Sequence, residues 1–145
     1  PISDQMFAAE RGQGAYLNNN RIRVSARKNL EDAIFATGIP FAGREGHSKF
    51  LQQLKSIMPE TSGIRRFGSA SLDLTYVAAG RFEGFWESNL KAWDIAAGIV
   101  IVREAGGFVS DLDGSNNMLK SGNIIATNDQ LHVTLSKLLN KAANH

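Results

Sequence analysis

The sequence of 145 residues contains no cysteine and no long uninterrupted apolar stretch. Without cysteine there is no disulfide framework, no thiolate metal site and no cysteine nucleophile, which is compatible with a reducing compartment. No stretch approaches the roughly 18 to 20 consecutive apolar residues that a membrane-spanning helix needs, and no signal-peptide pattern opens the chain. We therefore expect a cytoplasmic protein with no membrane partner.

The sequence also lacks an excess of charge of one sign. Its 16 Lys and Arg residues nearly balance 14 Asp and Glu residues, and the basic residues are scattered along the chain. A scattered distribution gives no basic patch of the kind that binds nucleic acid. The histidines at positions 47, 132 and 145 lack the paired spacing of a zinc site. The remaining composition, 43% hydrophobic and 21% charged, is typical of one globular domain.

The first part of the chain, residues 1–60, is predicted to be an antiparallel meander followed by a helix. Turn-type residues at 11–14 and 18–20 separate short apolar runs, and the predicted meander extends to Ala36. An amphipathic pattern follows and ends before Pro59. The chain opens on Pro1 without an initiating Met, so we expect an engineered boundary, a processed product or the latter part of a longer protein.

The second part, residues 61–145, alternates strand and helix patterns, which predicts an α/β layer. Predicted strands cover 64–67, 84–87, 108–110 and 123–126, and predicted helices begin near residues 70, 94 and 129. The polar segment 111–122 is predicted to be a loop. Its start, Asp111–Gly114, resembles a calcium loop, but the glycine comes too early and the closing Glu is missing, so we expect a turn.

The stretch from Glu87 to Gly98 carries the first chemical candidate, Asp94. Apolar residues recur at near-helical spacing after Asp94, and the run ends at Gly106-Gly107. A carboxylate at a helix start is stabilised by the positive end of the helix dipole and by backbone N–H groups. Such a fixed, ionised carboxylate suits a hard divalent cation. The alternative is that Asp94 only caps the helix and Trp93 only fills the core.

Two further candidates flank this helix. Gly68-Ser69-Ala70 lies where a strand turns into a helix, so its backbone N–H groups could receive an anion or a hydroxyl-rich ligand. Small residues at such a turn also serve packing alone. Glu87, at the end of a predicted strand, could face the same cleft and bind a substrate hydroxyl, or it could be an ordinary solvated carboxylate.

Taken together, these segments resemble the C-terminal half of the inositol monophosphatase family. The family's closing signature, Trp-Asp-x-Ala followed by Glu-Ala-Gly-Gly, matches Trp93–Gly98 (WDIAAG) and Val102–Gly107 (VREAGG). Supporting segments, in the family's order, are Glu10–Ala15 (ERGQGA), Arg65–Leu74 (RRFGSASLDL) and Val77–Gly84 (VAAGRFEG). The resemblance covers essentially the whole chain and is strongest to the bacterial branch, which includes proteins described as extragenic suppressors.

The resemblance implies a layered α-β-α-β-α sandwich, of which this chain is the C-terminal portion. It also implies roles for individual residues. Asp94 would be a ligand to the second Mg²⁺ and touch the substrate, and Glu87 would bind an inositol hydroxyl. Gly68, Ser69 and Ala70 would contact the sugar-like ring through backbone groups, with Arg65 supporting them from behind.

The resemblance further implies an inositol monophosphatase that is a lithium-sensitive homodimer. However, the family's Glu-Glu pair and its Asp-Pro-x-Asp-Gly-Thr motif, which supply most metal ligands, do not occur here. Because one carboxylate cannot hold a magnesium cluster, we expect residues 1–145 alone to be inactive. Two alternatives stay open. One is a non-catalytic role with RNA polymerase in an antitermination complex and ribosomal RNA maturation, and the other is hydrolysis of another small sugar phosphate or bisphosphate.

Overall fold

The structure is a computed structural model that describes residues 7–38, 47–65, 69–88 and 90–143. In chain order its strands and helices are β1 (Phe7–Glu10), β2 (Gly14–Leu17), β3 (Asn20–Ile22), the 3-10 helix η1 (Leu30–Asp32), β4 (Ile34–Thr37), α1 (His47–Ile57), the 3-10 helix η2 (Met58–Glu60), β5 (Gly63–Arg65), α2 (Ala70–Ala78), β6 (Gly84–Glu87), α3 (Ala92–Glu104), β7 (Phe108–Ser110), α4 (Met118–Ser121), β8 (Ile124–Thr127) and α5 (His132–Ala143).

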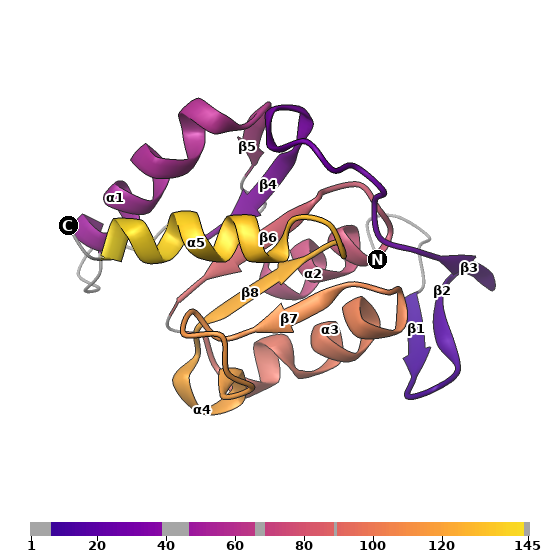
Figure 1. The fold of residues 1–145 in the computed structure, drawn as a ribbon. Coiled ribbons are helices and arrows are strands. Elements are labelled where there is room, and N and C mark those ends of the chain that lie inside the picture. Colours follow the sequence, from indigo (N-terminus) through magenta and orange to yellow (C-terminus); the bar gives the residue numbers. More distant parts are fainter. Residues whose placement is uncertain (1–6, 39–46, 66–68, 89, 144–145) are drawn as a thin grey trace.

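Strands β1, β2 and β3 form a small antiparallel sheet at one side of the molecule (Figure 1). Asn18 and Asn19 connect β2 to β3, and both have positive φ angles, 50° and 69°. Asparagine tolerates this left-handed conformation, which a two-residue hairpin turn of this type requires. The predicted meander is therefore present from β1 to β3.

Strand β4 does not continue this meander, so the prediction that it extends to Ala36 is wrong. β4 lies in a second sheet with the order β5-β4-β6-β8-β7, where it pairs in parallel with β5 and β6. Both faces of β4 are covered, because Phe35 and Ala36 are fully buried in two different apolar clusters. An unbroken apolar run is typical of a central parallel strand rather than of a half-exposed meander strand.

Helices cover both faces of this five-stranded sheet. α1 and α5 lie side by side on one face, and α2 and α3 pack on the other (Figure 1). Successive residues of β6 show the division, since Phe85 belongs to the cluster with α2 and α3 whereas Trp86 belongs to the cluster with α1 and α5. Each cluster therefore closes one face of the same sheet.

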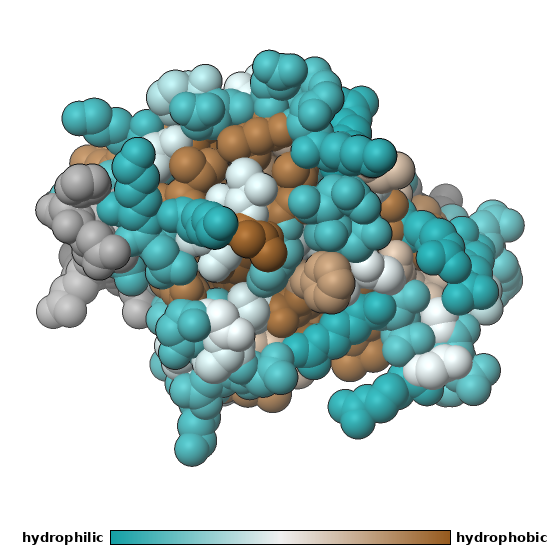
Figure 2. Space-filling model, viewed as in Figure 1, coloured by the Kyte–Doolittle hydropathy of each residue, from teal (hydrophilic) through white to brown (hydrophobic). Residues whose placement is uncertain are grey.

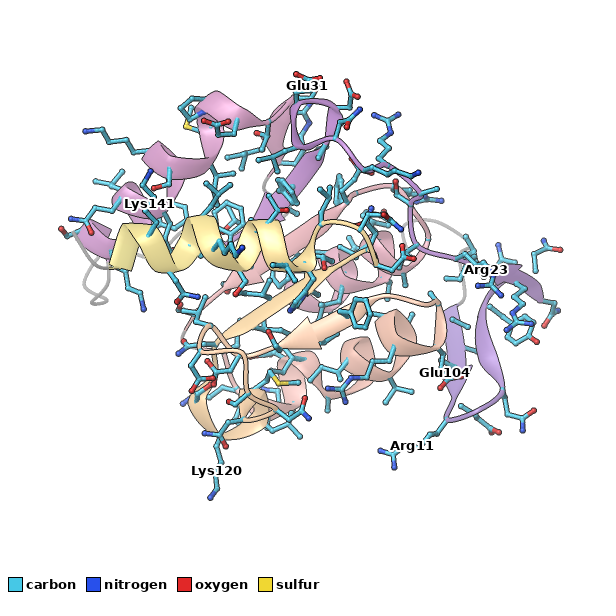
Figure 3. All side chains as sticks on the ribbon, in the orientation of Figure 1. Arg11, Arg23, Glu31, Glu104, Lys120 and Lys141 are labelled. Atoms are coloured by element: carbon cyan, nitrogen blue, oxygen red, sulfur yellow. The ribbon has the colours of Figure 1, made fainter. Side chains whose placement is uncertain are left out.

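The small sheet forms a fourth layer, because β1 and β2 pack against α3. Glu104, the last residue of α3, fastens this contact (Figure 3). Its two carboxylate oxygens accept hydrogen bonds from the backbone nitrogens of Gly12 and Gly14, at 2.9 and 2.8 Å, and these bonds lower the pKa of Glu104. The order helix, sheet, helix, sheet confirms the layered α/β fold predicted from the sequence.

On the face seen in Figure 2, apolar side chains emerge among hydrophilic ones over α5 and β7. Val133 of α5 and Phe108 of β7 are among the exposed large hydrophobic residues. Within the described residues, no helix is both long and apolar enough to span a membrane.

Candidate functional site

The candidate site lies at one edge of the five-stranded sheet, where the parallel strands β5, β4 and β6 all end. α2 follows β5 and α3 follows β6, and each helix leads to a further strand parallel to the one before it. Both helices therefore begin at this same edge and run back along the sheet. Ligands of α/β sheets commonly bind outside the carboxyl ends of parallel strands.

The close contact between α2 and α3 sets the register of the two helix starts. Gly98 of α3 lies directly against Leu74 of α2, since a Cβ built at Gly98 would be 2.7 Å from the Leu74 Cβ. One helical turn earlier, four residues back on each helix, stand Asp94 and Ala70. The fold thus brings the start of α2 and the Asp94 carboxylate to the same part of the edge.

Asp94 is the third residue of α3 rather than its N-cap, because the helix begins at Ala92. Its Oδ2 atom accepts a hydrogen bond from the Lys91 backbone nitrogen at 3.0 Å, and its own nitrogen donates to the Lys91 carbonyl oxygen at 2.9 Å. Asp94 therefore helps to cap the helix from its third position, although Lys91 is the N-cap residue. A carboxylate has about four acceptor positions, so this bond leaves capacity for a ligand.

Trp93 does not fill the core. Its side chain is 79% exposed at the start of α3. The prediction that Trp93 has only a core role is therefore wrong, because the helix turns this position outward while Ile95, two residues later, is fully buried.

Ser69 and Ala70 form the start of α2. Ser69 is the N-cap, and its Oγ atom accepts a hydrogen bond from the Leu72 nitrogen at 3.2 Å. The Asp73 nitrogen donates to the Ser69 carbonyl oxygen at 2.9 Å, which is the first bond of the helical ladder. The N–H groups of Ala70 and Ser71 belong to the donors that have no acceptor within a helix. Gly68, the first residue of the predicted ligand turn, lies outside the described residues.

Glu87 is the last residue of β6, and its carboxylate lies against the backbone at the end of β4. A Cβ at Gly38 would overlap the Glu87 carboxylate in its present position, so any larger residue at position 38 would displace this carboxylate. The Thr37 hydroxyl donates to the Trp86 carbonyl oxygen at 2.8 Å and ties the two strand ends together. Sequence reasoning missed Gly38, for which the one available signal is a glycine two residues after the predicted strand that ends at Ala36.

The described residues alone do not complete a magnesium site. Among them, no group of three or more His, Cys, Asp or Glu side chains could hold a metal ion. Mg²⁺ needs near-octahedral oxygen coordination, whereas this edge offers Asp94 as its predicted carboxylate ligand. Arg65, the predicted supporting residue, is exposed at the end of β5, and its Nη1 atom lies 3.4 Å from the Ile64 carbonyl oxygen.

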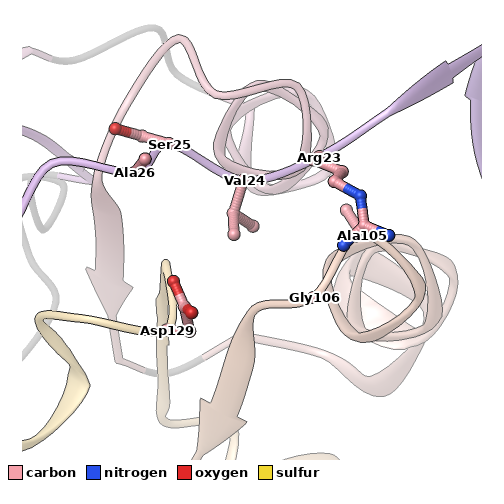
Figure 4. Close-up of a pocket in the computed structure, with 7 residues that line it drawn as sticks. All are labelled: Arg23, Val24, Ser25, Ala26, Ala105, Gly106 and Asp129. Carbon is pink, nitrogen blue, oxygen red and sulfur yellow. The ribbon is translucent and has the colours of Figure 1, made fainter.

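A pocket of about 200 Å³ lies elsewhere, at the opposite end of α3 (Figure 4). Its lining residues are Arg23, Val24, Ser25, Ala26, Ala105, Gly106 and Asp129. Neither Glu87 nor Asp94 is among them, so this pocket is separate from the candidate site.

Two titratable groups outside the predicted site residues have pKa values shifted by burial. Burial raises the pKa of Asp73, in α2, from its ordinary value of 3.8 to about 7. Burial also lowers the pKa of His132, whose ring nitrogens lie 2.9 Å from the Ser110 and Thr127 hydroxyl oxygens. His132 follows β8, which is antiparallel to β6, so it stands at the opposite edge of the sheet from Glu87.

The alternating helix and sheet layers, with a candidate site where parallel strands end, place the chain in the layered α/β class. Within that class, the family model named Inositol monophosphatase family matches residues 1–144, and the chain belongs to this family. This confirms the resemblance that the Trp93–Gly98 and Val102–Gly107 segments indicate.

The similar proteins include some named inositol-1-monophosphatase and some named Nus factor SuhB. An inositol-1-monophosphatase of Mesorhizobium japonicum is 50% identical over 141 residues, which are 97% of this chain and 53% of the relative. A Nus factor SuhB of Pseudomonas aeruginosa is 50% identical over 130 residues, which are 88% of this chain and 48% of the relative. The chain thus spans about half the length of these relatives.

Solved structures give the same result. The crystal structure of extragenic suppressor protein suhB from Bartonella henselae matches with a TM-score of 0.94 and 55% identity over 97% of this chain and 54% of that one. An inositol monophosphatase from Anabaena matches with a TM-score of 0.88 and 36% identity, covering 97% of this chain and 58% of that one.

Proposed function

We propose that the complete protein containing this chain hydrolyses a small phosphate monoester, with inositol monophosphate as substrate and Mg²⁺ as cofactor. The observation that carries the proposal is the convergence of Glu87, Asp94 and the start of α2 at one edge of the sheet. Family membership and the inositol-1-monophosphatase relatives support the same reaction.

The residues of this chain would bind and orient the substrate. Glu87, held against Gly38, accepts a hydrogen bond from a ring hydroxyl. The backbone at Gly68, Ser69 and Ala70 contacts the ring, and the N–H groups at the start of α2 favour a negatively charged group nearby. Asp94 contributes one carboxylate to the metal and contacts the substrate. The other metal ligands must come from outside the described residues.

The proposal is tested by measuring phosphate release from inositol 1-phosphate by the complete protein, with and without Mg²⁺. We expect Mg²⁺-dependent turnover, and we expect none from residues 1–145 alone. Glu87→Gln should raise KM for inositol 1-phosphate more than for a phosphate monoester without ring hydroxyls. Turnover of other sugar phosphates or bisphosphates in preference to inositol phosphate would contradict the substrate, and no turnover at all would contradict the reaction.

A second candidate function is supported by the name of a relative, Nus factor SuhB. The complete protein would then act as a non-catalytic partner of RNA polymerase in an antitermination complex. Pull-down with purified RNA polymerase, beside the phosphatase assay, separates the two functions. The proposal also includes that the complete protein is a cytoplasmic homodimer inhibited by lithium. Sedimentation tests the homodimer, and lithium titration of the phosphatase activity tests the inhibition.

A further inference from the structure

The loop that joins Glu87 to α3 is held by a residue far away in the sequence. Leu90, in the middle of this loop, donates its backbone N–H to the carbonyl oxygen of Gly122 at 2.9 Å. Gly122 is the C-cap of the short helix α4, which the sequence did not predict. Glu87 directly precedes this loop and Asp94 lies in the first turn of α3 directly after it, so a contact at Leu90 acts on both.

Glycine is required at position 122 for two independent reasons. Its φ angle is +77°, in the left-handed region that disfavours residues with a Cβ atom. In addition, a Cβ at Gly122 would overlap the carbonyl oxygen of Leu90 and would lie 3.0 Å from its nitrogen. Both obstacles are backbone atoms, so no side chain can rotate away to make room.

Helix α4, which carries Gly122, is attached by hydrogen bonds to the end of strand β7. The Ser121 hydroxyl donates to the Oδ2 atom of Asp111 at 2.5 Å, and the Leu112 nitrogen donates to Oδ1 at 2.6 Å. Asp111 is only 5% exposed and directly follows β7. Met118 of α4 is also buried, in the apolar cluster against which Leu90 packs. α4 is thus a fixed support for the loop.

We propose that Gly122 is a positioning residue that holds Leu90 so that Glu87 and Asp94 face the same substrate. The inference rests on the proposed function, because it assumes that both carboxylates serve one ligand. Displacement of Leu90 also moves its neighbour Lys91, whose N–H is the donor to Asp94. The Asp94 carboxylate is therefore the group most affected.

The test compares Gly122→Ala with Gly114→Ala in the complete protein. Gly114 lies in the same segment with a similar φ angle of +86°, but a Cβ there would meet nothing within 4 Å. Both variants suffer the same kind of backbone strain, and only Gly122→Ala presses on Leu90. We expect kcat/KM for inositol 1-phosphate to fall about 100-fold in Gly122→Ala, as a misplacement of about 1 Å can cause, and to stay within about twofold in Gly114→Ala.

Hydrogen exchange at the Leu90 amide gives a readout that does not depend on activity. We expect about tenfold faster exchange in Gly122→Ala and no change in Gly114→Ala, because only the first variant breaks the bond to Gly122. Equal losses of kcat/KM in the two variants, or an unchanged Leu90 amide in Gly122→Ala, would overturn the inference.

A second variant keeps the inference testable if Gly122→Ala does not fold. If Gly122→Ala fails to fold, Ser121→Ala replaces it, since this change removes the bond to Asp111 without adding atoms, and it should speed Leu90 exchange about threefold. An unchanged rate would count against the inference.

If the wild-type protein is inactive while Leu90 is protected and responds to Gly122→Ala, the proposed function fails but the contact between Gly122 and the loop stands.

Discussion

Asp73 carries a buried carboxyl group that lacks hydrogen bonds among the described residues. It is 1% exposed, and neither of its oxygens has a hydrogen-bond partner among the described residues. Burial raises its pKa from 3.8 to about 7 because the charged form loses its hydration. The folded protein therefore binds a proton more tightly than the unfolded chain between about pH 4 and pH 7, and stability falls as the pH rises through this range.

Asp73→Asn should remove this pH-dependent loss, since the amide has the same shape and no charge. We expect the variant to be more stable than wild type by about 4 kcal/mol at pH 8, because the shift is about three pKa units and each unit is worth about 1.4 kcal/mol, and to show no gain near pH 4. Urea unfolding at both pH values measures the difference.

Asp113→Asn is the matched control for this experiment. Asp113 is exposed, and hydrogen bonds from Ser115 lower its pKa, so removing its charge gives no stabilisation at pH 8. A gain for Asp73→Asn that is the same at pH 4 and pH 8 would show that Asp73 does not titrate as described.

The contact between helices α2 and α3 aligns the parts of the candidate site. Gly98 stands where α3 lies directly against α2, and a Cβ built there would be 2.5 Å from the Leu74 Cδ1 atom. Replacing glycine by alanine inside a helix ordinarily adds about 1 kcal/mol of stability. Here the added methyl group must push α2 away. The cost of this steric clash exceeds the gain in helix propensity.

Gly98→Ala is therefore expected to destabilise the protein by about 1 to 3 kcal/mol, the usual range for overpacking. The double variant Gly98→Ala with Leu74→Ala should lose less than the sum of the two single changes, because the smaller side chain makes room. Chemical denaturation of the four proteins gives the coupling. Additive losses would mean that the two side chains do not meet.

Several elements could be predicted from local sequence pattern. The strands at 84–87 and 108–110 have the predicted bounds, because each is a short apolar run next to glycine. The pairing of β4 could not be predicted, since its partners β5 and β6 are distant in the sequence. α4 was missed because a helix of four residues has no periodicity to detect.

The candidate site shows the same division between local and distant information. Glu87 and Asp94 stand out because the sequence places them at a strand end and at a helix start. Gly38 and Gly122, which make room for Glu87 and for Leu90, could not be recognised, because each touches a segment that is remote along the chain. Local pattern thus finds the chemical groups, whereas only the fold shows what holds them.

At the scale of the whole molecule, this chain supplies four alternating layers and one side of a candidate site. The residues proposed to face the substrate come from the end of β6 and the starts of α2 and α3, and the described residues leave the metal ligands incomplete. The chain also spans about half the length of its relatives. We therefore propose that catalysis belongs to the complete protein and that this chain binds and orients the substrate.

Asp94→Asn in the complete protein tests whether Asp94 serves the metal and the substrate. Asparagine retains an oxygen that can accept the Lys91 N–H, so the helix cap survives while the charge is lost. Asp113→Asn is the control, because Asp113 is also a carboxylate that accepts a backbone N–H, from Ser115 at 2.9 Å. We expect at least about a tenfold loss of phosphatase turnover and a weaker response to Mg²⁺ for Asp94→Asn, with a Tm within a few degrees of wild type. Turnover and Mg²⁺ dependence equal to those of Asp113→Asn and wild type would contradict this role of Asp94.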